Sequence, residues 1–122
     1  MDEKDNEIVD ILTRIGMTKN TAKVFIAIKE LDNPDTKQIM QFTGIMQPQI
    51  SVAIHKLQEM GYIEVKLERT EKRGRPISYF FFCVSMEDIL HDMIARVLKK
   101  IDAEKQNIAK LKELIENYIY DE

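Results

Sequence analysis

The densest group of chemically active side chains in this 122-residue sequence is a short basic segment. From Lys66 to Pro76 the chain carries five basic and two acidic residues, and Arg73-Gly74-Arg75 lies within it. Arginines on a thin extended tip suit a narrow minor groove, where the negative potential of a duplex is enhanced. The alternative interpretation is a hairpin tip kept in solvent by its charges. The segment indicates contact with an anionic partner, not a reaction.

A second group of polar side chains lies upstream, on a helix predicted from about Gln47 to Met60. Pro48 suits its first turn, where a missing N–H is harmless, and Gly61 suits its end. Ile50, Ile54 and Leu57 form its apolar stripe, with the small Ala53 beside them. The side chains outside that stripe could contact base edges and phosphates, or could form an ordinary solvated surface: Gln47, Pro48, Gln49, Ser51, Val52, His55 and Lys56.

The spacing of residues supports neither catalysis nor metal binding. Apart from methionine, the soft metal ligands are Cys83, His55 and His91, and no CxxC, HExxH or paired-histidine spacing occurs. No glycine-rich phosphate loop is present. We therefore expect no enzyme activity, no metal and no cofactor. Cys83 is predicted to be a buried small hydrophobic residue, with a redox switch as the alternative.

The size and charge of the chain narrow the class of protein. A length of 122 residues allows one domain, or a small domain with an extension. The formal net charge of −3 excludes a uniformly basic nucleic-acid coat, but residues 36–76 hold seven basic and four acidic side chains. A basic middle between acidic flanks indicates a local anionic contact. No long apolar run or leader is found, so we expect a cytoplasmic protein without a membrane partner.

The elements that position these groups are predicted to be short helices separated by turns. A first helix, ending at Gly16, is predicted from residues at helical spacing: Ile8, Ile11, Leu12 and Ile15. A second helix, capped by Thr18, is expected to reach about Leu31. Thr36 is predicted to cap a third, which runs from Lys37 to about Thr43. Lys37, in the first turn of that helix, is a candidate phosphate contact or an ordinary surface lysine.

A helix-turn-helix followed by a hairpin is the predicted core of the fold. Gly44 and the residues after it separate two short helices by a tight turn, which is helix-turn-helix geometry. Residues 62–69 alternate apolar and charged side chains, as a half-buried strand does, and residues 77–84 read as a second strand. A basic hairpin directly after a helix-turn-helix predicts a winged helix, an α+β fold that is mainly α.

Several stretches resemble one group of proteins. Residues 13–85 resemble the winged-helix domain of archaeal TrmB-like regulators, within the wider MarR and ArsR group. The similar stretches are IGMTKNTAKVFIAIKEL, TKQIMQFTGI, LQEMGYIEV and KRGRPISYFF, while MQPQISVAIHKL is similar to the recognition-helix pattern of ArsR-type repressors. This resemblance is specific for the fold and for DNA binding as a class, and poor at separating subfamilies.

The resemblance implies a role for particular residues. It places Gln47, Pro48, Gln49, Ser51, Val52 and His55 on the face that enters the major groove, and Arg73 and Arg75 on the wing. Lys72, which precedes them in the basic segment, is a further candidate DNA contact. The sequence departs from the group at three points. It lacks the paired cysteines of metal-sensing ArsR proteins and the added domain of sugar-sensing TrmB proteins, so neither form of sensing carries over. Met46 stands where a Ser or Thr cap is frequent.

The last third of the chain is predicted to be one long helix, Met86 to Ile119. At about 1.5 Å per residue it would measure roughly 51 Å, which exceeds what a compact domain needs. Its heptad positions carry a seam, interrupted by Glu104, that we expect to mediate dimerisation: Leu90, Ile94, Val97, Ile101, Ile108, Leu111, Ile115 and Tyr118. Packing of this helix on its own domain is the alternative.

These predictions combine into one expected architecture and function. Residues 1–85 would form a winged-helix DNA-binding domain and residues 86–122 a coiled-coil dimerisation helix. We expect a homodimeric transcriptional regulator that binds double-stranded DNA at a palindromic or near-palindromic site. A protein-docking module of the transcription machinery and a nonspecific architectural DNA-binding protein are the alternatives. The sequence does not indicate an operator, the sign of regulation or a small-molecule effector.

Overall fold

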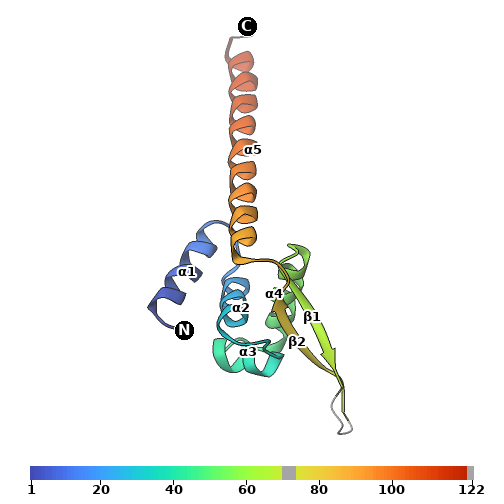
Figure 1. Ribbon diagram of the computed structural model, residues 1–122. Helices are drawn as coiled ribbons and strands as arrows, with labels where there is room; N and C mark the ends of the chain where they lie inside the picture. Colours follow the sequence, from blue (N-terminus) through green and yellow to red (C-terminus); the bar gives the residue numbers. More distant parts are fainter. Residues whose placement is uncertain (70–73, 121–122) are drawn as a thin grey trace. The chain divides into compact units, whose positions relative to one another are not determined.

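The computed structural model describes residues 1–69 and 74–120 of the chain. It consists of two compact units, Met1–Ser85 and Met86–Glu122. The second unit is the helix α5 (Met86–Tyr120), and the first contains all the other elements, drawn in Figure 1: α1 (Glu3–Arg14), α2 (Lys19–Glu30), α3 (Thr36–Thr43), α4 (Gln47–Glu59), β1 (Ile63–Glu68) and β2 (Ile77–Phe82). Helix-turn-helix and hairpin together form a winged helix, which confirms the predicted fold class.

Helix α2 is the centre of the first unit. It contacts α1, α3, α4 and β2, and seven of its residues from Thr21 to Ile28 are buried. The ring of Phe25 meets that of Phe82 edge to face, with the centroids 5.1 Å apart, which joins α2 to the second strand. Every element that positions the exposed polar groups therefore packs directly or indirectly on α2.

Glycines end three helices as predicted, Gly44 after α3 among them, and the other two helices close with the same bonds. After α1, the amide of Gly16 donates to the carbonyl of Thr13 and that of Met17 to Leu12, at 3.2 and 3.0 Å. Gly16 has a φ of 116°, which permits this Schellman turn. The same pattern of bonds closes α4 around Gly61, whose φ is 79°. Two of the four predicted members of the α1 stripe, Ile11 and Ile15, are exposed, and Val9 is buried with Leu12 instead.

The N-terminal cap of α3 is Asp35, so the prediction of Thr36 is wrong. The Asp35 carboxylate accepts from the amide of Gln38 at 2.8 Å, and the Gln38 side chain accepts from the amide of Asp35 at 3.0 Å. This reciprocal pair is a capping box. Thr36 becomes the first residue of the helix because the box places the cap one residue earlier.

The hairpin pairs β1 with β2 antiparallel, from Ile63 opposite Phe82 to Glu68 opposite Ile77. Its base is tied to the helices, because the amide of Phe80 donates to the carbonyl of Pro34 at 3.0 Å. The prediction that β1 is half-buried is wrong beyond its first residue. Ile63 is buried, but Val65 and Leu67 are exposed, the latter by 66%. The strands run outward past the helices, as Figure 1 shows, so this face is covered at its base, where Phe80 is buried, and exposed towards Leu67.

Cys83 is exposed, which overturns its predicted burial. It follows the last residue of β2, where the chain has left the core. Its amide donates to the carbonyl of Tyr62 at 3.0 Å, and its thiol Sγ donates to the carbonyl of Gly61 at 3.3 Å. These bonds fix the residue to the loop between α4 and β1.

Helix α5 runs for 35 residues and exposes its apolar seam. Seven of the eight seam residues are exposed in the single chain, and Val97 is half-buried. Within residues 1–69 and 74–120, no helix is both long and apolar enough to cross a membrane.

The two candidate caps of α3 give a direct test. Replacing Asp35 with Ala removes the carboxylate that accepts from the Gln38 amide and leaves the bond donated by the backbone amide of residue 35, and we expect the free energy of unfolding to fall by about 1 kcal/mol. Thr36→Ala is the matched control, which we expect to change stability by less than about 0.5 kcal/mol. Urea denaturation of the two variants measures the difference. Equal losses would contradict the assignment of Asp35 as the cap.

Candidate nucleic-acid interface

The two faces of α4 are sharply different. Its apolar stripe is buried as predicted, and the polar residues between the members of that stripe are exposed. Val52 also faces solvent, with 56% of its surface exposed. The predicted contact residues therefore occupy the outer face of α4, with Lys56 half-buried at its edge: Gln47, Pro48, Gln49, Ser51, Val52 and His55. This face offers side-chain donors and acceptors along successive turns.

The first turn of α4 lacks a side-chain cap, as the sequence indicated at Met46. The amides of Gln49 and Ile50 both donate to the carbonyl of Met46, at 3.1 Å each. Pro48 has no N–H at all. Among the described residues, the Gln47 amide has no hydrogen-bond partner, so it is the one backbone donor left at this end. A helix N-terminus with a free N–H favours a negatively charged group.

A hollow of about 320 Å³ lies beside this face. It is formed where the start of α2 meets α4, and its lining includes Thr18 and Asn20 as well as α4 residues that were predicted from the sequence: Pro48, Gln49, Val52 and Lys56. Thr18 and Asn20 were missed because they lie about thirty positions upstream. The cap formed by Thr18, which accepts from the Thr21 amide at 3.3 Å, fixes this end of α2. The polar surface thus extends from α4 onto α2.

His55 has a carboxylate neighbour on its own helix. Its Nε2 lies 2.9 Å from the Glu59 Oε1, one turn further along, and both side chains are largely exposed. The Glu59 carboxylate repels phosphate, and its contact with His55 holds the imidazole toward Glu59. His55 is therefore less available as a contact than the spacing alone predicted.

The described part of the hairpin carries exposed basic side chains on both of its arms. Arg69 and Arg75 are exposed on its two arms. Lys72 and Arg73, which the sequence singled out, lie outside the described residues. Lys37 is exposed in the first turn of α3, where the sequence placed it.

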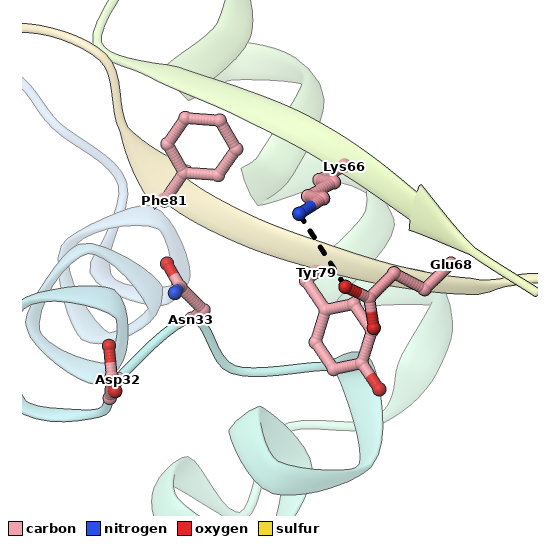
Figure 2. A pocket seen from close by; sticks show the side chains of 6 residues that line it. All are labelled: Asp32, Asn33, Lys66, Glu68, Tyr79 and Phe81. Atoms are coloured by element: carbon pink, nitrogen blue, oxygen red, sulfur yellow. Dashed lines mark ion pairs between the residues drawn. The ribbon is translucent and has the colours of Figure 1, made fainter.

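A larger hollow on the hairpin does not fit a nucleic acid. It has a volume of about 490 Å³ and is lined by side chains from one face of the sheet and from the loop after α2: Asp32, Asn33, Lys66, Glu68, Tyr79 and Phe81. Figure 2 shows Lys66 directed toward Glu68, and the Nζ and Oε1 atoms are 3.5 Å apart. With Asp32 present, the charges sum to −1 at neutral pH, which disfavours phosphate. Exposed pairs of this kind add little stability.

Among the described residues, the pair with shifted pKa values lies at the end of α2, and the possible metal ligands do not cluster. Within residues 1–69 and 74–120, no three His, Cys, Asp or Glu side chains gather in a way that could hold a metal ion. The hydrogen bond from Lys29 to Glu30, 2.7 Å long, raises the pKa of Lys29 and lowers the pKa of Glu30. That pair is at the end of α2 opposite Thr18.

The fold is shared with solved structures of transcriptional regulators. A protein described as a possible transcriptional regulator from Methanosarcina mazei Go1 matches with a TM-score of 0.64 and 16% identity, over 85% of this chain and 86% of that chain. A MarR-family regulator from Silicibacter pomeroyi matches with a TM-score of 0.54 and 13% identity, over 93% and 80% of the two chains. Both likenesses establish the fold: the chain is a winged-helix protein.

Finer assignments stay predictions. Streptococcus pneumoniae FabT in complex with DNA matches with a lower TM-score of 0.46 and 16% identity, over 95% of this chain and 87% of that chain. No protein-family model matches the sequence. No curated protein matches it either. The resemblance to archaeal TrmB-like regulators is not confirmed by these comparisons.

Proposed function

We propose that the protein is a sequence-specific DNA-binding transcriptional regulator that acts as a homodimer. Helix α4 would lie in the major groove and the wing, residues 69–76, at the minor groove. Two copies related by a two-fold axis would bind a palindromic or near-palindromic promoter site. Binding alone would change access to the promoter, without a catalysed reaction, and the cytoplasm is the expected compartment.

The observation that carries this proposal is the composition of the outer face of α4. Gln49 and Ser51 project from its first turns while the alternate positions, such as Ile50, hold the helix in the core. Amide and hydroxyl groups at the N-terminal end of an exposed helix suit base edges in the major groove. The free amide of Gln47 and the polar rim around Thr18 add donors for a phosphate.

The distribution of charge supports the same partner. The basic excess of the chain is concentrated in residues 36–76, which include α3, α4 and the hairpin, although the chain as a whole is acidic. Phosphate contacts of this kind supply the part of the affinity that does not depend on sequence. The proposed contacts are Lys37, Lys56, Lys72, Arg73 and Arg75.

Two other functions use the same fold. A protein-docking module would not require arginines on the hairpin, and a nonspecific architectural protein would carry a larger basic excess. Footprinting of purified protein on genomic DNA, repeated at several salt concentrations, separates the three. A regulator protects discrete sites, an architectural protein protects DNA without preference, and a docking module protects none. The last two results would contradict the proposal.

The wing assignment predicts a change in salt dependence. Replacing Arg73 and Arg75 with Ala removes two cationic groups, so DNA binding weakens. The slope of log affinity against log salt should become shallower by roughly one unit for each lost phosphate contact. Arg14→Ala, on α1, is the control. Fluorescence anisotropy across a salt series measures the slope, and an unchanged slope would refute the wing contact.

The face of α4 predicts a loss of base discrimination. Gln49→Ala or Ser51→Ala should alter preference at particular base pairs by about 1–3 kcal/mol and leave nonspecific affinity nearly intact. Gln58→Ala, on an exposed later turn of α4, is the matched control. Binding to a library of single-base-pair site variants measures this preference. A uniform loss on all sequences would make these residues positioning contacts.

The seam on α5 predicts loss of assembly. Changing Ile108 and Leu111 to Asp places two charges per chain in the proposed interface, and we expect a monomer that binds a half-site weakly. Ala103→Asp with Ala109→Asp, on the outer face of α5, is the matched control and should stay dimeric. Sedimentation at micromolar concentration measures both. A monomeric intact protein would contradict the proposed dimer.

A further inference from the structure

The charges around the middle of the α5 seam constrain how two copies can pair. Glu104 occupies a core-type position of the heptad pattern, midway between Leu90 and Tyr118. Lys100 and Lys105 occupy the positions that flank the seam. All three are exposed in the single chain, and no ion pair of the described part of α5 includes them. The inference that follows rests on the proposed homodimer.

A parallel pair of helices places like charges together. In that arrangement each core residue meets its own counterpart, so Glu104 would face the partner's Glu104 in the seam. In a parallel pair, a flanking residue of one helix also lies near the flanking residue of the partner whose number is higher by five. Lys100 would therefore approach the partner's Lys105. A desolvated carboxylate is costly unless it is paired with an opposite charge. A parallel pair instead sets two carboxylates against each other at its centre.

An antiparallel pair removes these contacts. The seam has two alternating rows of residues, heptad positions a (Ile94, Ile101, Ile108, Ile115) and d (Leu90, Val97, Glu104, Leu111, Tyr118). In an antiparallel pair each a residue meets a d residue of the partner. One register sets Glu104 opposite the partner's Ile101. The same register aligns Val97 with the partner's Ile108. It brings the partner's Lys100 next to the layer that contains Glu104, where a long ammonium side chain reaches the carboxylate. Glu104 of each chain then lies near Lys100 of the other chain, so the pair contains two contacts between opposite charges.

The two neighbouring antiparallel registers are less favourable. A shift of one heptad in one direction sets Glu104 opposite the partner's Ile108 and brings Lys105 level with the partner's Lys105. The opposite shift sets Glu104 opposite the partner's Ile94 and brings Lys100 level with the partner's Lys100. In the first register Lys105 meets the apolar Leu98 of the partner, against which its methylene stem packs. On the other side of the seam, Met93 meets the partner's Leu114.

We propose that α5 pairs with a second copy of itself in the antiparallel direction, with Glu104 opposite the partner's Ile101. The first residues of the two helices, Met86, then lie roughly 50 Å apart along the axis, at about 1.5 Å per residue. Each winged helix is joined to its own Met86 through Ser85 and is thereby tethered near one end of the rod. The points at which the two DNA-binding units are attached are therefore separated by the length of the pair.

Cross-linking of the full chain tests the direction. In a Cys83→Ser background, Val97→Cys protein is mixed with Ile108→Cys protein and treated with a bismaleimide that spans about 8 Å. The antiparallel register predicts cross-linked heterodimers in the mixture and few cross-links in either protein alone, because identical positions lie roughly 16 Å apart along the axis. Efficient cross-linking of the Val97→Cys protein to itself would overturn the proposal.

A matched control separates contact from collision. Lys99→Cys and Gln106→Cys form a pair with the same axial offset on the outer face of α5, and their mixture should cross-link at a background rate. Sedimentation of each variant establishes whether it is dimeric. A dimer with the parallel cross-linking pattern overturns only the direction, whereas a monomer overturns the dimer of the proposed function as well.

A distance measurement does not require any change in the seam. A spin label at Asn117→Cys, on the outer face of α5 in the Cys83→Ser background, reports on the separation of the two C-terminal ends. We expect roughly 44 Å along the axis for the antiparallel pair, from about 1.5 Å per residue. A separation below about 25 Å, close to the width of two packed helices, would overturn the proposal.

Discussion

The packing of α4 on α2 is the contact on which the rest of the structure depends. Because an α-helix turns about 100° per residue, burying one stripe of α4 decides which other side chains reach solvent. Ile54 and Leu57 hold the helix by that stripe, and Val52 is forced outward with the polar residues around it. The surface proposed to read DNA is therefore a consequence of the core. A small rotation of α4 about its axis would replace that surface with another.

The features that could be predicted from the sequence are those that depend on neighbouring residues. Gly16, Gly44 and Gly61 each follow a helix, and each adopts the positive φ that a left-handed turn requires. The cap of α3 was harder, because Asp35 and Thr36 are adjacent and both are good caps. Only the position of Gln38 relative to each decides between them, since a capping box needs a spacing of three residues.

Which side chains other elements of the fold bury could not be predicted in the same way. The alternation along β1 fixes which side chains share a face, but not whether anything packs on that face, and Leu67 is exposed as a result. Cys83 is exposed for the same reason, one residue beyond the end of β2. In the candidate interface, the sequence predicted the face of α4 but missed Thr18 and Asn20. Their place beside that face arises from the packing of helices distant in the sequence.

The pairing of the hairpin leaves one strand edge open. Phe80 of β2 bonds to Pro34 on its outer side, whereas in the described residues β1 has β2 as its sole strand partner. An exposed edge beside apolar side chains such as Leu67 can recruit strands from other molecules and begin aggregation. Glu64, Lys66 and Glu68 alternate along that edge and supply charges that oppose such stacking. By this principle the charged side of β1 would disfavour edge-to-edge association of the folded protein, independent of any ligand.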